Sequence, residues 1–531
     1  MKKLYKLGQF VFLGIVAVMF FLTTGIAGPK RGGDLISLFA QFPPHFNCAI
    51  KSGAAIASPC SNVFAALVEI NEDWEAVPYL AKSWEISPDG LTYTFHLVEG
   101  TVFHDGKPVT SKDVAFSLGV TKKNHPFGPY MFGAVDRVET PDKYTAVIKL
   151  KQPHPALMIA LSLPLMPILP EHVYGKGEIR KNPANIKAIG SGPFKVAEYN
   201  AGKSFILERF DKFMRPGRPY LDRFIGKKNV SPSSSLIAVS RGEAHSWGFV
   251  GDPQMVAKLK KEKNLNVTAK GYQGISSVSF LEFNLRKKYV KDKKVRQAIA
   301  YAMDRDFITQ RLHRGLTHKS TGPIHSSSPF YTDKINQFEF NLKKANQLLD
   351  DAGYKRQSDG MRFELNLIYM PALPYGQKMI AEYLKPQLKK IGIKINLKAP
   401  ADFMNWYMNL AKWEHDMSTS NIFGWGDPVI GIHRLFMSTN IKHQVWTNTA
   451  GYVNKEVDGL LNDAAVENDI NKRKALYAEF QKIVAEDLPV YFTVEDAFHT
   501  AFNKDLMGIP TGIWGSLGTS DSMYWKNGKA P

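Results

Sequence analysis

Cysteine is scarce in this sequence: Cys48 and Cys60 are the only two among 531 residues. Two cysteines cannot build the disulfide framework of a small secreted domain. No cysteine directly follows the N-terminal apolar run, so a lipid anchor there is not expected. Both cysteines lie in one stretch, "FNCAIKSGAAIASPCS". Two states stay open, a disulfide that closes this loop or two buried thiols.

Acidic residues are absent from the first 27 positions. There Lys2, Lys3 and Lys6 precede an apolar run, 11–22, and the small residues of "TGIAG". This pattern predicts a signal peptide, residues 1–27, cleaved near Ala27, and hence a periplasmic protein. The apolar run is shorter than the roughly 20 residues of a membrane-spanning helix.

Enzyme motifs are also lacking. No G-x-S-x-G or H-E-x-x-H occurs, and no two histidines have the i, i+3 or i+4 spacing of a helical metal site. "AGKS" at 201–204 resembles the end of a phosphate loop, but Ala197 stands where the first glycine is required. Asp89 and Asp105 precede glycines in turns. We therefore predict no catalytic residue, no metal site and no cofactor.

A basic excess is present instead. The formal charge of +19 becomes +16 without Lys2, Lys3 and Lys6, and the remaining lysines are dispersed. Because no base-reading motif accompanies them, we expect a solvated basic surface and no nucleic-acid partner. A chain of 531 residues is too long for one core, so two or three domains are expected.

Strand and helix patterns alternate along the chain. Alternating apolar residues predict a half-buried strand over 91–97, and 295–303 carries one buried helical stripe. Two strands, 363–370 and 393–400, flank a helix pattern in which Pro386 should cause a kink or a break. Such a strand, helix, strand unit favours parallel pairing and an α/β fold.

One forty-residue segment carries a family resemblance. Residues 79–118 read "YLAKSWEISPDGLTYTFHLVEGTVFHDGKPVTSKDVAFSL". This segment resembles the signature of bacterial extracellular solute-binding proteins of family 5, the peptide/nickel type. Further matching blocks begin at Gly190, Phe280 and Asn341. The resemblance covers essentially the whole chain after the predicted signal peptide.

The resemblance implies an α/β, two-lobe periplasmic-binding-protein fold, type II-like of cluster C, with an extra α+β domain inserted in the first lobe. Its segments would be 28–70, 190–285 and 490–531 for lobe I, 71–189 for the inserted domain and 286–489 for lobe II. The implied function is a substrate-binding receptor that delivers a peptide or peptide-like solute to an inner-membrane ABC permease. A monomer is expected.

Three loops are predicted to face the ligand. The first contains Phe42 and Asn47, although Pro43 and Pro44 equally suit a rigid turn. In the second, "GEAHSWGFVGDP", Trp247 is a candidate stacking wall. Tyr272 follows that loop, and core packing is its competing role.

The third loop is "NIFGWGDPVIG", residues 421–431. In peptide-binding relatives the corresponding loop carries a tryptophan and an aspartate that pairs with the ammonium group of the peptide. This loop is shorter than theirs, so Asp427 has two open roles, ammonium partner or cap of the turn before Pro428. Trp425 and Gly426 are predicted to line the site.

Two alternatives remain open at this point. A receptor of the same kind could take an opine, a modified sugar or a metal chelate. An exported hydrolase is the alternative of another class, and turnover of substrate by the purified protein would distinguish it.

Overall fold

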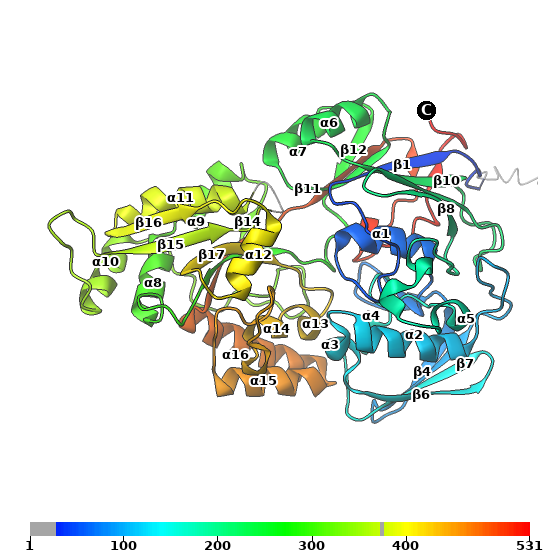
Figure 1. Cartoon of the computed structure of the whole chain (residues 1–531), viewed down its shortest axis with the longest axis horizontal. Helices are drawn as coiled ribbons and strands as arrows, with labels where there is room; N and C mark the ends of the chain where they lie inside the picture. The colour runs from blue at the N-terminus through cyan, green and yellow to red at the C-terminus, as the bar shows by residue number, and fades with distance from the viewer. Residues whose placement is uncertain (1–27, 372–375) are drawn as a thin grey trace, which may run out of the picture.

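The computed structural model describes residues 28–371 and 376–531, so the predicted signal peptide lies outside the described residues. Three large sheets organise the molecule into the predicted two lobes and inserted domain (Figure 1). Among the described residues, no helix is long and apolar enough to cross a membrane.

Lobe I is built on a seven-stranded mixed sheet that draws on distant parts of the chain. Its strand order is β12 (Leu265–Thr268), β19 (His499–Asn503), β11 (Ser246–Val250), β1 (Asp34–Phe39), β10 (Arg223–Lys228), β9 (Ser204–Arg209) and β8 (Phe194–Asn200). Strand β1 pairs in parallel with β10 and β11. The helices of this lobe are α1 (Ala54–Val63), α6 (Pro232–Ser240) and α7 (Pro253–Leu259), and the last segments are β20 (Leu506–Met507), η5 (Gly515–Leu517) and β21 (Tyr524–Trp525).

The inserted domain lies beside lobe I and carries an antiparallel sheet. Its order is β4 (Ala81–Ile86), β5 (Thr92–Leu97), β7 (Thr145–Leu150) and β6 (Val135–Asp142), and a short pair, β2 (Val68–Ile70) and β3 (Ala76–Pro78), precedes it. Its helices are α2 (Ser111–Asn124), α3 (Gly128–Phe132), α4 (Leu157–Ala160), α5 (Glu171–Tyr174), η1 (Ile179–Lys181) and η2 (Pro183–Asn185). Strand β5 alternates half-buried and buried residues, which confirms the predicted strand.

Lobe II contains a six-stranded sheet, seen on the left of Figure 1. The order is β14 (His318–Lys319), β18 (Val490–Glu495), β13 (Val278–Phe283), β17 (Met417–Ile422), β15 (Phe363–Tyr369) and β16 (Ile393–Lys398). Its helices are α8 (Lys293–Ala302), α9 (Arg305–Phe307), η3 (Ile308–Leu312), α10 (Leu342–Asp351), α11 (Gln377–Lys389), α12 (Phe403–Ala411), α13 (Pro428–Gly431), α14 (His433–Phe436), η4 (Ser438–Asn440), α15 (Lys455–Val466) and α16 (Ile470–Asp487). Strands β15 and β16 pair in parallel, as predicted, and α11 is not split at Pro386.

Three expected boundaries, 70/71, 285/286 and 489/490, differ from the sheets, and the first of them separates β2 from β3, which pair with each other. Strands β13 and β18 were assigned to lobe I, but they pair with each other inside the sheet of lobe II. Both strands are buried at every position, and each is flanked by two strands of the lobe II sheet. We therefore propose that the chain crosses between the lobes at 269–277 and 496–498.

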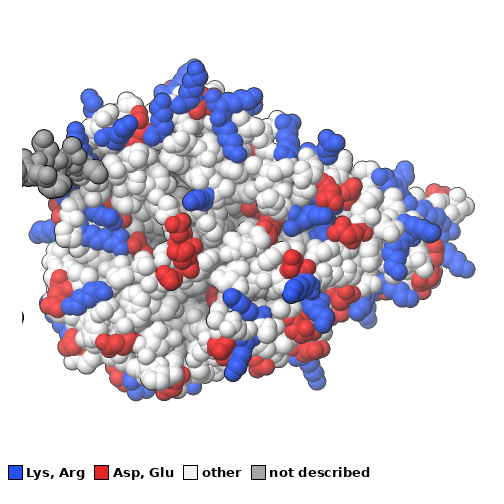
Figure 2. All heavy atoms as spheres, turned by 180° about the vertical axis from the view of Figure 1, so that it is seen from behind, with Lys and Arg blue, Asp and Glu red and all other residues white. Residues whose placement is uncertain are grey.

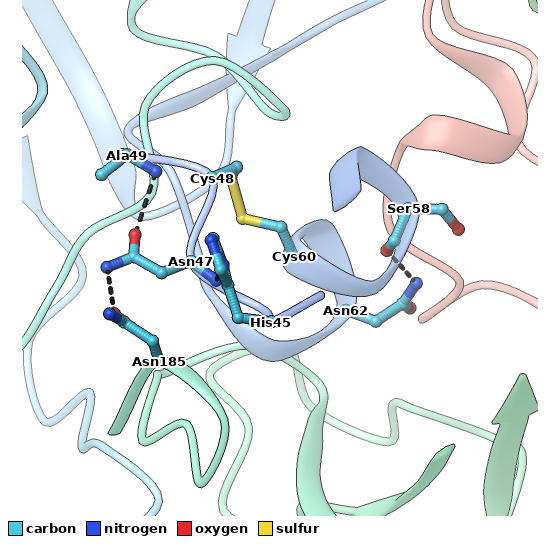
Figure 3. Close-up of a disulfide and its surroundings, with 8 residues drawn as sticks. All are labelled: His45, Asn47, Cys48, Ala49, Ser58, Cys60, Asn62 and Asn185. Carbon is cyan, nitrogen blue, oxygen red and sulfur yellow. Dashed lines mark hydrogen bonds between the residues drawn. A yellow bond between two sulfur atoms is a disulfide. The ribbon is translucent and has the colours of Figure 1, made fainter. Parts of the chain in front are cut away.

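The loop that holds both cysteines is closed by a disulfide between Cys48 and Cys60 (Figure 3). This bond joins the loop after β1 to the buried part of α1. On the molecular face in Figure 2, Lys and Arg are spread among Asp and Glu, as a solvated basic surface requires.

Removal of the disulfide should destabilise lobe I. The bridge closes a loop with a sequence separation of 12, and loops of about this size are worth about 3 kcal/mol through restriction of the unfolded chain. The Cys48→Ser/Cys60→Ser variant should therefore unfold at a lower urea concentration than the oxidised protein. Reductant should shift the wild type toward the variant and leave the variant unchanged; equal midpoints for all samples would contradict the prediction.

Acid should also destabilise the fold through the half-buried His104 and the buried His125. His104 and His125 accept backbone N–H groups at Nδ1 over 3.2 Å and 3.0 Å, which requires that nitrogen to be unprotonated. Burial lowers the pKa of His104 to about 4 and that of His125 to about 3. The unfolded value is about 6.5, so this stability is complete above pH 6.5 and is lost as the pH falls toward 4 and 3.

Each of these histidines should contribute up to about 1.4 kcal/mol per pH unit in that window. Urea unfolding measured from pH 7 to pH 4.5 checks this slope. In His104→Asn, whose amide oxygen can still accept the N–H of Gly190, the slope should be smaller; an unchanged slope would exclude His104 as a source.

Candidate functional site

A cavity of about 520 Å³ lies where the two lobes and the inserted domain meet. Its volume falls within the range of about 300 to 1,000 Å³ that is typical of small-molecule sites. The wall consists of residues 37–41, 52–55, 58, 246, 248–249 and 516–517 of lobe I, Phe127 of the inserted domain, and Met370, Phe403, Asn421, Phe423, Trp425, Arg434 and Trp446 of lobe II. All three units are therefore needed to enclose it.

Trp425, one of the predicted ligand residues, lies on this wall. Its backbone has the left-handed φ of 50°, and its side chain is 3% exposed. The ring lies 5.8 Å from Phe127 and 6.3 Å from Trp514, measured between ring centroids. Trp425 thus joins lobe II to the inserted domain and to the C-terminal segment across the site.

Asp427 has the capping role of the two that were left open. It is the N-cap of α13, and its Oδ1 accepts the N–H of Val429 over 2.9 Å. Its two carboxylate oxygens also accept from Arg473 Nη1 and Nη2 over 2.8 Å and 2.7 Å. The carboxylate is buried and does not lie on the cavity wall, so its position gives no support to an ammonium partner.

Three other predicted ligand residues lie off the cavity wall. Gly426 has a φ of 81°, and a side chain there would meet Ile159 of the inserted domain. Asn47 is fully buried and donates to Asn185 Oδ1 over 2.9 Å (Figure 3). Phe42 packs on Tyr199. These three residues pack behind the cavity wall and do not line the cavity.

Strand β11 explains the position of Trp247. Adjacent side chains of a strand point to opposite faces. Ser246 and Gly248 line the cavity, whereas Trp247 packs into the apolar core beneath α6 and α7. Trp247, which was predicted to be a stacking wall, therefore lies on the face of β11 that points away from the cavity.

Tyr272 does not line the cavity but supports a residue that does. Its hydroxyl accepts the N–H of Phe249 over 2.8 Å and is 2.8 Å from Thr500 Oγ1. The two aromatic rings are in edge contact, with centroids 5.1 Å apart. Phe249 is the wall residue, and Tyr272 fixes its place.

Sequence reasoning missed Phe127, Arg434 and the start of α1. Arg434 is the one charged side chain among the wall residues, and it is 7% exposed. A usable signal for it was present, because the arginine interrupts the apolar run "PVIGIHRLFM". Arg434 Nε donates to the carbonyl of Gly431 over 2.9 Å, and its guanidinium carbon lies 4.6 Å from the ring centre of Phe127.

A cavity enclosed by two lobes, with aromatic walls and no cluster of catalytic groups on them, is the arrangement of a solute-binding protein. Family comparison supports this class. Residues 75–443 match the model of "Bacterial extracellular solute-binding proteins, family 5 Middle". The chain belongs to this family.

Named relatives extend the match over most of the chain. Oligopeptide-binding protein AppA of Bacillus subtilis is 29% identical over 506 residues, which cover 90% of this chain and 89% of AppA. The solved structure of AppA in complex with a nonapeptide has a TM-score of 0.79 at 27% identity, with 94% of this chain and 99% of AppA covered. The substrate-binding protein CtaP of Listeria monocytogenes gives 0.81 at 27% identity, with 94% and 100% covered.

A relative of another ligand type is equally similar in fold. NikZ from Campylobacter jejuni, solved in complex with Ni(L-His), gives a TM-score of 0.80 at 25% identity, with 92% of this chain and 97% of NikZ covered. These relatives confirm the predicted two-lobe α/β fold.

Asp427→Asn should destabilise the protein without selecting among ligands. The change removes the negative charge that Arg473 contacts in a buried site, and breaking such a pair costs up to about 3 to 5 kcal/mol. Urea unfolding should show a large loss for Asp427→Asn and a change within about 0.5 kcal/mol for the exposed Asp463→Asn. A specific loss of affinity for amine-bearing ligands at unchanged stability would contradict this role.

Proposed function

We propose that this protein is the substrate-binding receptor of an ABC importer and captures a peptide or peptide-like solute between its lobes. The observation that carries the proposal is the cavity of about 520 Å³ that only the assembled units enclose. Closure around a ligand expels water and couples binding to the relative position of the lobes, which a permease can recognise.

Several relatives support a peptide-like ligand. AppA and the dipeptide-binding protein of Escherichia coli match this chain over 90% and 91% of its length. The apolar and aromatic wall suits the side chains and flat amide groups of a short peptide derivative. We further propose that the protein is exported through residues 1–27, acts in the periplasm as a monomer, and delivers its ligand to an inner-membrane permease.

Ligand retention tests the proposed function. Native mass spectrometry of freshly purified protein should show a bound small molecule that denaturation releases unaltered. Ser246→Phe should abolish this binding, because residue 246 lines the cavity and a phenyl group would fill part of it. Ser233→Phe makes the same change at an exposed position of α6 and should retain the ligand.

A thermal-shift panel of di- to pentapeptides, their N-acetylated forms and nickel chelates should then identify the ligand type. Stoichiometric binding without change to the compound is expected. If the wild type turned over a peptide or glycoside and Ser246→Phe did not, the receptor function would be rejected in favour of an exported hydrolase.

A further inference from the structure

Arg434 differs from the other buried arginines of the described chain. Arg296 and Arg305 direct their terminal nitrogens to backbone carbonyls. Arg362 contacts Asp350, and Arg473 contacts Asp427. The guanidinium of Arg434 makes one hydrogen bond to the described residues, through Nε, and its Nη1 and Nη2 donate to none of them.

No carboxylate of the protein balances this charge. Residues 1–27 and 372–375, which the structure does not describe, contain neither Asp nor Glu, so every acidic side chain of the chain is described. None of them forms an ion pair with Arg434, and none lies on the cavity wall. A buried cation without a partner is costly, so the site favours a ligand that supplies the missing anion.

The guanidinium keeps its charge at neutral pH. Burial lowers the pKa of Arg434 to about 9. The guanidinium carbon lies over the ring of Phe127, and Nη1 and Nη2 have no acceptor among the described residues. A carboxylate matches this pair of nitrogens because it accepts two parallel hydrogen bonds from a guanidinium.

The start of α1 adds a second positive element to the same wall. Ser52, Gly53, Ala54 and Ala55 line the cavity, and Gly53 provides no side-chain cap for the helix. The backbone N–H groups of Ala54 and Ala55 make no hydrogen bond to the described residues. An uncapped helix N-terminus has a partial positive charge, so it favours an anion in this cavity together with Arg434.

We propose that the ligand is a small organic acid with an apolar or aromatic body, whose carboxylate binds Arg434 and whose amino group, where it has one, is blocked. This deepens the proposed function, on which it rests. An N-acyl amino acid or an N-blocked short peptide has this chemistry. A free ammonium group would enter a cavity that already holds a cation and has no acidic side chain on its wall.

Isothermal titration with three related probes tests the charge preference, and the first two probes have nearly equal shape. N-acetyl-L-phenylalanine is an anion, N-acetyl-L-phenylalanine amide is neutral, and L-phenylalanine amide is a cation. The wild type should bind the acid at least about tenfold more tightly than the neutral amide, because the amide cannot make the charge-assisted contact with Arg434. The cation should bind most weakly of the three. Equal affinity for acid and neutral amide, or a preference for the cation, would overturn the inference.

Variants of Arg434 assign that preference to one residue. Arg434→Gln should bind the acid at least about tenfold more weakly and the neutral amide unchanged, so that the preference disappears. Arg434→Lys should recover part of it, which separates charge from packing. Arg311→Gln, at an exposed position outside the cavity, should behave as the wild type. A preference that survives in folded Arg434→Gln would overturn the assignment; if that variant does not fold, the acid-to-amide ratio of the wild type decides.

The retained ligand separates this inference from the proposed function. Material released from the wild type by denaturation should carry a carboxylate and no free amine. A retained neutral or cationic compound would overturn the inference and leave the receptor function intact. No retained compound, together with no binding of any probe or panel peptide, would overturn both.

Discussion

The buried ion pair between Asp427 and Arg473 fixes the loop on which the site depends. The carboxylate receives two hydrogen bonds from Arg473 and one from the backbone of Val429, so it sets the start of α13. Trp425 precedes this fixed point and Arg434 follows it on α14. Arg473 lies on α16. A helix that is distant in the sequence therefore helps to position Trp425 and Arg434.

Aromatic contacts between lobe II, the inserted domain and the C-terminal segment enclose the cavity. The same contacts affect how strongly charges interact inside it. Trp425 meets Phe127 and Trp514, and Arg434 lies over Phe127. Where lobe II and the inserted domain meet in this way, protein atoms replace part of the solvent around the cavity. The preference for ligand charge then depends on the few polar groups inside, since electrostatic interactions strengthen as the local dielectric falls.

Sequence patterns predicted the local structure better than the faces and the partners. Period-two alternation found β5, and helical spacing found α8, because both are local properties. The wrong face of Trp247 and the displaced boundaries at β13 and β18 share one cause. Both depend on which distant strand pairs with the segment. The residues of β11 alone do not predict its pairing with β1 and β19.

The dependence on distant residues also explains why the sequence left two possible roles open for Asp427 and gave no role to Arg434. An acid before proline can cap a turn or contact a ligand, and only the position of Arg473, 46 residues later, decides between them. With Asp427 paired to Arg473, the short loop has no other acid to offer an amine. Arg434, which follows this loop on α14, is then the one formal charge on the wall, so the ligand group that we propose at this place is an anion and not an ammonium group.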